Sequence, residues 1–564
     1  MSNKEELHKL PDNWIWTTIG DIAILTSGGT PSRANSGYFK GLIPWVKSGE
    51  LNYNIINDTE EKITQEALDS SSAKIVPSKS LLIALYGSTV GKIAILGIDS
   101  STNQAVASIT NFTNFNQHFL YYYLLHNREK LLQKRKGGAQ PNISQKILSE
   151  FHFPLPPLSE QNQIVFKIEQ FFSELEQSEK VLQKATHQLK LYRQALLKSA
   201  FEGKLTKNWR KNNQNFDANL ELADIKDKRK SKYQLEINEE IVKKPKINYN
   251  FTFEKNKVLK TWADANLDNL IGINARIGWR GLTKKEYTKE GVLFLSVHAL
   301  NYGKNVLYKD ANHITIERYE ESPEIRLKIN DILLCKDGAG IGKIGIIKNL
   351  PEKATVNSSL LVIDAKEVFN PDFLYYFFLG PTMQKLVNEK IFGSAIPHLF
   401  QKDIKKFNLK VPPSIEQNQI VEILESRFTL IENLEKSINH ILNSIIILRH
   451  SILKKAFEGK LLNQDFTDES ANNLLHKIKK EKRDYLNAQK ELEKLKPKTK
   501  NKMDTKLTLL EILEESNVPL STQELWENSV HEGDIEGFYN EIKEIYSKLN
   551  DVKDGTKSLL SIKK

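Results

Sequence analysis

Two short stretches of the chain combine glycine and lysine as phosphate-binding loops do. "GSTVGKI" begins at Gly87 and "GAGIGKI" begins at Gly338. A P-loop places four residues between its first glycine and the Gly-Lys pair, and a serine or threonine after the lysine binds magnesium. Both stretches have only three residues in that interval, and isoleucine follows each lysine. We therefore predict that each stretch is a turn between strands, from which Lys92 and Lys343 can still reach a phosphate.

Other catalytic motifs are missing from the sequence. It contains no H-E-x-x-H, no G-x-S-x-G and no EF-hand loop, and its twelve histidines are scattered. The segment "FNPDF" at Phe369 departs from the N/D-P-P-Y/F tetrapeptide of amino-methyltransferases, and no carboxylate–lysine nuclease cluster stands out. We predict a non-catalytic chain with no catalytic residues and no metal site.

Composition points to a large, basic protein. The chain has 564 residues, enough for several domains, and a formal net charge of +11. This positive net charge favours an acidic polymer as partner, and nucleic acid is the first candidate. A lysine-rich surface on an ordinary soluble protein gives the same charge. The single cysteine, Cys335, fits a reducing compartment. The sequence shows neither a signal peptide nor a membrane span, so we predict a cytoplasmic location.

A phrase without obvious chemistry occurs twice. "PPLSEQNQIV" starts at Pro156 and "PPSIEQNQIV" at Pro412, an offset of 256 residues. The same offset relates "SAFEGKL" at Ser199 to "KAFEGKL" at Lys455. Because no gap separates the two anchors, an element of fixed length is duplicated.

The interval between the anchors has the pattern of a long helix. Apolar residues recur at alternating steps of four and three, which is typical of a coiled-coil seam, with Ser178 and Arg427 as polar interruptions. Gly203 and Gly459 are placed to end the helices. Each helix is apolar on one stripe only, so we predict that the two pair; the alternative is that each packs on its own globular domain. The predicted core of the pair is Ile164, Ile168, Leu175, Leu182, Leu189, Leu196, Ile420, Leu424, Ile431, Ile438, Ile445 and Ile452.

The regions before the two helices repeat more faintly. "ALYGSTVGKIAIL" at Ala84 corresponds to "CKDGAGIGKIGII" at Cys335, and both halves mix short apolar strands with helices. We predict an α+β protein with two globular domains separated by two long helices, and a small winged-helix-like domain at the end. The predicted divisions are 1–153 and 258–410 for the globular domains, 154–205 and 411–461 for the helices, 206–257 for a polar linker, 462–504 for a charged helical linker, and 505–564 for the winged-helix-like domain.

These features together resemble the DNA-specificity subunit of type I restriction–modification enzymes. The resemblance rests on the paired "EQNQIV" and "AFEGKL" phrases, with "WVKSGELN" and "NQAV" (Asn103) in the first half, and covers roughly Leu10–Leu462. It implies that each globular domain is a target-recognition domain that reads one half of a split DNA sequence. It also implies that the helices pair as an antiparallel coiled coil and fix the length of the unread spacer.

The resemblance further implies the partners of the chain. The chain would bind double-stranded DNA, and the surfaces of its helices would bind two methyltransferase subunits, which use S-adenosylmethionine to methylate adenine at N6. Restriction subunits, which translocate with ATP and magnesium, would join the complex. The specificity subunit itself would bind no cofactor and do no chemistry. A specificity subunit of a split type II system or of a methylation-only system, a coiled-coil scaffold without DNA, and a fused methyltransferase–nuclease are the alternatives.

Candidate DNA-binding residues are polar side chains in loops or at strand ends, because lysine and arginine supply phosphate contacts and polar side chains read base edges. In the first domain they are Thr30, Ser32, Arg33, Lys47, Ser48, Lys92, Asn103 and Gln104, with Lys134, Arg135 and Lys136 as a phosphate clamp. In the second they are Arg276, Trp279, Arg280, Lys284, Ser296, His298, Lys336, Lys343 and Asn357. The final domain has many acidic residues, so protein is at least as good a partner for it as DNA.

Overall fold

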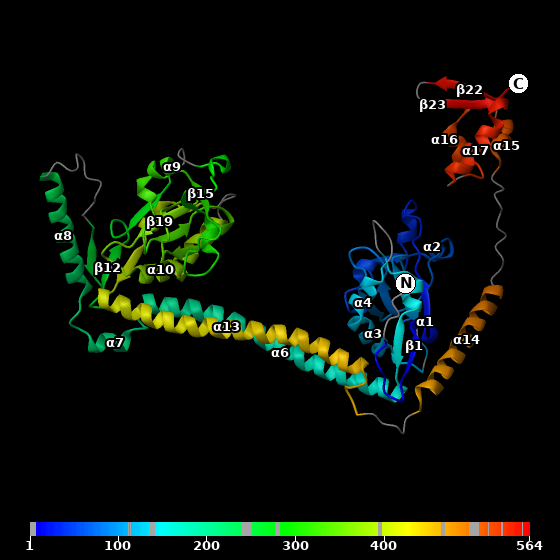
Figure 1. The fold of residues 1–564 in the computed structure, drawn as a ribbon, viewed down its shortest axis with the longest axis horizontal. Coiled ribbons are helices and arrows are strands. Elements are labelled where there is room, and N and C mark those ends of the chain that lie inside the picture. Colours follow the sequence, from blue (N-terminus) through cyan, green and yellow to red (C-terminus); the bar gives the residue numbers. More distant parts are fainter. Residues whose placement is uncertain are drawn as a thin grey trace. The chain divides into compact units, whose positions relative to one another are not determined.

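The computed structural model describes residues 7–110, 112, 114–135, 142–238, 251–276, 282–392, 398–463, 469–495, 507–516, 518–531, 534–554 and 557–563. Two compact units divide the chain: Met1–Phe166 with Leu453–Lys564, and Lys167–Ile452. Both mix helices and strands (Figure 1). Among the described helices, none combines the length and the apolar character that crossing a bilayer requires.

The first globular domain is built on two small sheets. The larger has the strand order β2-β9-β6-β7-β4 and the smaller the order β5-β3-β8, in which β3 and β8 are parallel. A separate pair, β1 with β10, joins the two ends of the domain. The strands are β1 (Ile15–Thr18), β2 (Ile24–Ser27), β3 (Ile43–Val46), β4 (Ile55–Ile56), β5 (Glu61–Ile63), β6 (Leu81–Ala84), β7 (Ile93–Leu96), β8 (Ser101–Thr102), β9 (Val106–Thr110) and β10 (His152–Leu155).

The second globular domain repeats this frame. Its four-stranded sheet has the order β13-β19-β16-β17, and its three-stranded sheet, β15-β14-β18, again contains one parallel pair. A third sheet has the order β11-β12-β20. The strands are β11 (Phe253–Lys255), β12 (Ala263–Asn266), β13 (Gly272–Ala275), β14 (Val292–Leu295), β15 (Asn312–Ile314), β16 (Ile332–Cys335), β17 (Ile344–Ile346), β18 (Ala354–Val356), β19 (Leu360–Asp364) and β20 (Asn408–Val411).

The two glycine-lysine stretches are turns, as predicted. The first connects the antiparallel strands β6 and β7, and the second connects β16 and β17. Gly91 and Gly342 adopt φ values of 75° and 83°, which residues with a Cβ atom rarely adopt. The strands around them are fully buried and consist of Leu, Ile and Ala, with Cys335 at the end of β16 and a glycine within β17, which explains why they read as short apolar segments.

A long helix follows each globular domain in sequence, and the two helices have equal length. They are α6 (Leu158–Phe201) and α13 (Ser414–Phe457), each 44 residues long. At 1.5 Å per residue each is about 66 Å long. Within the unit Lys167–Ile452 they lie side by side (Figure 1).

Two ion pairs establish that the helices run antiparallel. Arg193 of α6 contacts Glu435 of α13 at 3.4 Å, and Glu179 of α6 contacts Arg449 at 3.3 Å. Moving forward along α6 therefore means moving backward along α13. The predicted antiparallel pair and the α+β fold class are confirmed.

The same two arginines reveal an internal two-fold relation. Arg193 lies over the ring of Phe428 with its guanidinium carbon 5.2 Å from the centroid, and Arg449 lies over Phe172 at 5.1 Å. Both contacts are related by the 256-residue offset, which also relates the two ion pairs. The duplicated sequence thus packs against itself, and the cation–π contacts add to the seam.

Only one of the two apolar rows is buried along most of the seam. In α13 the row that repeats every seven residues through Ile438 and Ile445 is buried, whereas Leu434, Ile441 and Leu448 of the adjacent row are 53%, 45% and 48% exposed. The predicted core residues Leu175, Leu182 and Leu189 are half-buried. The other predicted core residues are buried: Ile164, Ile168, Leu196, Ile420, Leu424, Ile431, Ile438, Ile445 and Ile452.

The segments outside this repeat are partly helical. The predicted linker contains α7 (Lys207–Asn212) and α8 (Ala218–Asn238). After the second long helix, α14 (Ala471–Leu495) packs against the first domain through an ion pair of 3.1 Å between Lys479 and Asp21. The final domain, described from Leu507 onward, has its own small apolar core.

One buried carboxyl makes the second domain sensitive to pH. Asp331 is 5% exposed, and burial raises its pKa to about 6, although its side chain accepts a hydrogen bond from the backbone N–H of Lys328 at 2.7 Å. The folded state therefore keeps a proton that an unfolded aspartate loses near pH 3.9. This contribution to the free energy of unfolding, about 3 kcal/mol, is lost as pH rises from about 4 to about 6.

We expect Asp331→Asn to remove this dependence, because an amide accepts the same hydrogen bond without charge. The variant should be more stable than the parent at pH 7.5, and the difference should shrink towards pH 4. Urea unfolding of both proteins across this range measures it. A stability difference that does not change with pH would contradict the assignment of the raised pKa to Asp331.

Candidate nucleic-acid interface

The lysines of the two turns are held identically in the two domains. Lys92 donates a hydrogen bond from Nζ to Oδ1 of Asn52 at 3.0 Å, and Lys343 donates to Oδ1 of Asn301 at 2.7 Å. Both acceptors are neutral amides, so neither contact cancels the lysine's positive charge. Lys92 and Lys343, both predicted phosphate contacts, are therefore each held in place by an uncharged acceptor.

Other predicted cations of the first domain are engaged with acidic neighbours. Arg33 contacts Glu61 at 2.7 Å, and Lys47 contacts Glu60 at 2.8 Å and Glu61 at 3.0 Å. The hydrogen bonds that Lys47 donates to Glu60 and Glu61 raise the pKa of Lys47, and the hydrogen bond that Arg33 donates is the main cause that lowers the pKa of Glu61. Both cations are therefore held beside β3 and β5, with part of their charge compensated.

A polar group adjoins this cluster. Thr30 and Gln104 are hydrogen-bonded through their side chains, which joins the loop after β2 to the loop after β8. The backbone N–H of Asn103 donates to the carbonyl of Val46 at 2.9 Å, so the same loop is pinned to β3. Ser32 and Gln104 are exposed, and Ser48 is half-buried at the start of a short 3-10 helix. The structure thus gathers most of the first domain's predicted readers around the ends of β2, β3 and β8.

Arg276 takes a structural position in the second domain. It is 3% exposed, and its guanidinium donates to the carbonyl of Val356 at 3.1 Å and to the hydroxyls of Ser322 and Thr355 at 3.4 Å. The group also lies over the ring of Phe294. A guanidinium bound in this way joins β14 and β18 to the neighbouring loop, and it is not presented at the surface for DNA.

The remaining predicted residues of the second domain that the structure describes differ in their contacts and in their exposure. Lys336 contacts Asp337 at 2.8 Å, and Asp337 also contacts His398. Asn357 accepts a hydrogen bond from the N–H of Ser359 at 3.1 Å and is half-buried. Ser296 is half-buried at the end of β14, and His298 and Lys284 are exposed.

Three predicted residues, Lys136, Trp279 and Arg280, lie outside the described part of the chain. Lys134 and Arg135, which precede Lys136, are described. Lys134 lies over the ring of Phe151 at 5.3 Å, and Arg135 is exposed and donates to the carbonyl of Leu132. Of the predicted phosphate clamp, only Arg135 thus extends to the surface in the described residues.

The repeated "EQNQ" phrase docks each long helix to the domain before it. Trp14 donates from its indole N–H to Glu160 at 2.8 Å, and Trp262 donates to Glu416 at 2.8 Å. One residue later, Gln161 accepts from the backbone N–H of Asn116 at 2.9 Å, and Gln417 accepts in the same way from Asn370 at 2.7 Å. The two asparagines cap the aromatic helices α3 (Gln117–His126) and α10 (Pro371–Leu379).

The repeated "AFEGKL" phrase docks the far end of each helix. Phe201 at the end of α6 packs edge-on against Phe373 and Phe377 of α10 in the second domain. Phe457 at the end of α13 packs in the same way against Phe119 and Tyr123 of α3 in the first domain. Each long helix is therefore anchored by hydrogen bonds at its start and by aromatic packing at its end.

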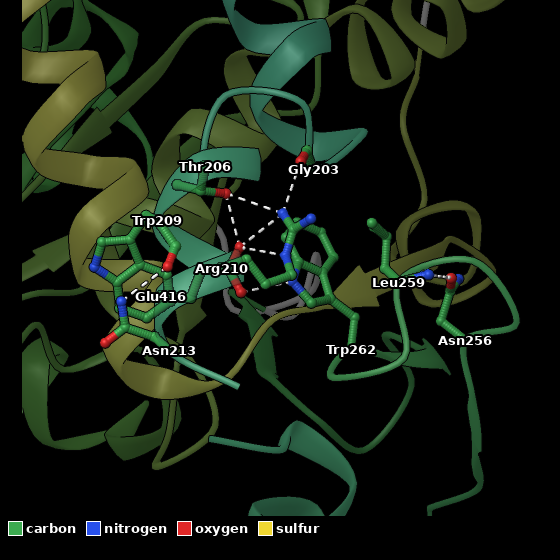
Figure 2. Close-up of polar contacts among 9 residues, drawn as sticks. All are labelled: Gly203, Thr206, Trp209, Arg210, Asn213, Asn256, Leu259, Trp262 and Glu416. Atoms are coloured by element: carbon green, nitrogen blue, oxygen red, sulfur yellow. Dashed lines mark hydrogen bonds and ion pairs between the residues drawn. The ribbon is translucent and has the colours of Figure 1, made fainter. Parts of the chain in front are cut away.

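A buried ion pair reinforces the start of α13 (Figure 2). Arg210 of α7 lies 2.8 Å from Glu416 and also donates to the carbonyl of Gly203 at 2.6 Å. Glu416 accepts further hydrogen bonds from Thr206 and Trp262, at 2.7 and 2.8 Å. Glu416 is buried, and its charge is matched by Arg210 and four donated hydrogen bonds in all. The repeated glutamate in the sequence was a signal for this anchor. Nothing in the sequence pattern indicated that Arg210 would pair with it.

Comparison with known proteins defines the class. A family described as the type I restriction modification DNA specificity domain matches residues 11–185 and 259–443. The EcoBI specificity subunit of Escherichia coli is 28% identical over 395 residues, which cover 67% of this chain and 75% of that protein. The EcoKI specificity subunit of E. coli strain K12 is 25% identical over 500 residues, which cover 84% of this chain and 96% of that protein.

A solved chain from the type I R-M system has a TM-score of 0.58 and 18% identity, covering 81% of this chain and all of its own length, and so shares the fold. With the family match spanning more than half of its length, the chain belongs to the type I restriction–modification DNA-specificity family, and it is a specificity subunit. The second family match ends at residue 443, within α13.

Proposed function

We propose that this chain is the non-catalytic subunit that reads a bipartite DNA target, with one globular domain on each half-site. The observation that carries the proposal is the duplicated frame: two domains with equivalent sheets and equivalently held lysines, each anchored to the start of one long helix and to the end of the other. Dissimilar loops on a common frame suit two different half-sites, because base edges are read by the side chains that loops present.

The helix pair would set the distance between the half-sites. The two recognition domains must contact the duplex at fixed positions along its helical turn. The same side of the groove recurs about every 34–36 Å along the duplex. A coiled coil with ion pairs at Arg193 and Arg449 has a fixed register, so its residue count fixes a length. A flexible linker of the same length would hold no such distance.

Lys92 and Lys343 are the residues we expect to bind backbone phosphates. Replacing both with alanine should weaken binding to all DNA sequences alike and reduce the slope of log affinity against log salt by about 2, because each phosphate contact contributes about 0.9. Fluorescence anisotropy at several salt concentrations measures this. Alanine at Lys204 and Lys228, which are exposed and paired with glutamate and aspartate, is the control. An unchanged salt slope in the Lys92/Lys343 variant would contradict the assignment.

The exposed row of the helix pair supports a role as a docking surface for methyltransferase subunits. Leu434, Ile441 and Leu448 form an apolar strip beside the buried seam, and Tyr192 is the equivalent of Leu448 in α6. Contiguous exposed apolar residues of this kind mark protein interaction sites. S-adenosylmethionine would bind the methyltransferase partners, and ATP and magnesium the restriction partner, so this chain would hold no cofactor.

Methylome sequencing tests the proposal. Cells that carry this chain with its methyltransferase subunit should show N6-methyladenine in two short sequences separated by an unread spacer of constant length. Exchanging the first globular domain for that of another specificity subunit should change one half-site and leave the other. Methylation at a single continuous sequence, or at none, would contradict the proposal.

A further inference from the structure

The C-terminal domain has the topology of a winged helix. Its elements follow the order α15 (Leu509–Glu515), β21 (Leu520–Ser521), α16 (Thr522–Asn528), α17 (Ile535–Ile545), β22 (Leu549–Asp554) and β23 (Lys557–Ile562), and the sheet order is β21-β23-β22. In winged-helix proteins that bind DNA, the helix at the position of α17 in this order enters the major groove. The topology alone would therefore suggest a third DNA contact.

The negative charge of the domain's helices argues against DNA binding. Residues 507–545, which carry the three helices, contain ten Asp and Glu residues against one lysine, Lys543. The strands that follow are weakly basic, and residues 507–564 together have a formal net charge of −6. Proteins bind DNA by neutralising phosphates with cations, so a helical face of this charge is repelled by the duplex.

The exposed side of α17 has instead the character of a protein interface. Ile535 and Tyr539 are 62% and 61% exposed, one helical turn apart, and Tyr546 just beyond the helix is also exposed. Phe538, on the neighbouring face of the helix, is buried in the domain's own core with Ile542 and Ile545 packed against it, and Ile535 and Tyr539 lie outside that core. Aromatic and aliphatic anchors surrounded by charge are typical of the centres of protein interfaces.

We propose that this acidic helical face docks on the proposed DNA-binding surface of the chain's own recognition domains, which includes Lys92 and Lys343, and competes there with DNA. Charge complementarity selects this occupant: residues 1–153 and 258–410, the two recognition domains, carry formal net charges of +2 and +5 against −6 for the C-terminal domain. Attachment to the same chain gives the domain a millimolar effective concentration, so a weak contact suffices. The inference rests on the proposed DNA-recognition function, and its consequence is that non-specific DNA binding is suppressed.

The test compares full-length chains that differ in four glutamates. Glu514, Glu515, Glu527 and Glu544 are exposed and take no part in the helix N-caps of the domain, so their replacement by glutamine should leave its fold intact. We expect this variant to bind a non-specific duplex about tenfold more tightly at 50 mM salt, and the gain to vanish at high salt because the contact is electrostatic. Anisotropy with a fluorescent duplex gives both affinities.

A charge-matched control separates docking from the general effect of removing negative charge. The control variant replaces Glu169, Glu174, Glu422 and Glu432, exposed on the long helices, by glutamine. If the C-terminal variant gains no more affinity than the control, or loses affinity, competition by the domain is overturned while DNA recognition stands. If neither the parent nor either variant binds DNA, the proposed function fails and the inference fails with it.

Zero-length cross-linking gives a second readout. A carbodiimide joins a carboxylate to a lysine amine only when the two are in contact. We expect cross-links from residues 507–545 to lysines of the recognition domains, Lys92 and Lys343 among them, and their loss when a duplex is added. Absence of such cross-links, or cross-links that DNA leaves unchanged, would overturn the proposal.

Discussion

Seven residues inserted into each of the two long helices are expected to lengthen the unread spacer of the target by about three base pairs. Seven residues add about 10.5 Å of helix, and base pairs rise 3.4 Å each. A seven-residue insertion also keeps the apolar seam in phase. Three base pairs turn the groove by roughly 100°, so we expect slower modification at the new sites as well.

The two insertions must face each other for the pairing to survive. Thr186 and Leu442 each lie midway between the ion pairs that Arg193 and Arg449 make, so these two positions are opposite in the antiparallel register. Insertion after Ala185 in one helix and after Leu442 in the other therefore lengthens the pair symmetrically. Both ion pairs and both arginine–phenylalanine contacts remain available on either side of the insertion.

Methylome sequencing of the inserted variant measures the spacer directly. Two controls accompany it: insertion in one helix only, which should break the register and abolish modification, and replacement of seven exposed residues without a change in length, which should leave the spacer as it was. A doubly inserted variant that methylates sites with the original spacer would refute the idea that the helix pair sets the distance.

Removing Arg210 is expected to destabilise the unit Lys167–Ile452 by about 3–5 kcal/mol, because it leaves a buried carboxylate without its cation. The side chain of Glu416 is 1% exposed and that of Arg210 13%, so water cannot replace the guanidinium. The loss should appear as a lower unfolding temperature and as faster hydrogen exchange in the first turns of α13.

A double-mutant cycle identifies the cause. Arg210→Ala combined with Glu416→Gln should recover much of the loss, since glutamine still accepts the hydrogen bonds from Thr206 and Trp262 without a buried charge. Lys204→Ala, which breaks an exposed ion pair with Glu202, should cost less than about 1 kcal/mol. Equal effects of Arg210→Ala and Lys204→Ala would show that burial of the Glu416 pair contributes nothing.

Features with a local period could be predicted from the sequence. The helix pair, its equal lengths and most of its buried residues follow from a heptad pattern and a constant 256-residue offset, which need no knowledge of distant contacts. The turns at Lys92 and Lys343 were also predictable, because glycine at a positive φ and flanking apolar runs are properties of a few consecutive residues.

Partners that are distant in sequence were decided by the tertiary structure alone. Arg276 resembled a DNA contact by its loop, yet the fold buries it against residues about 50–80 positions away. The repeated Glu and Gln of "EQNQ" showed no function until Trp262 and Asn370 were brought to them. Composition and periodicity determined what kind of elements this chain forms, whereas the pairing of charges and hydrogen bonds depends on which elements meet, and a linear pattern does not contain that information.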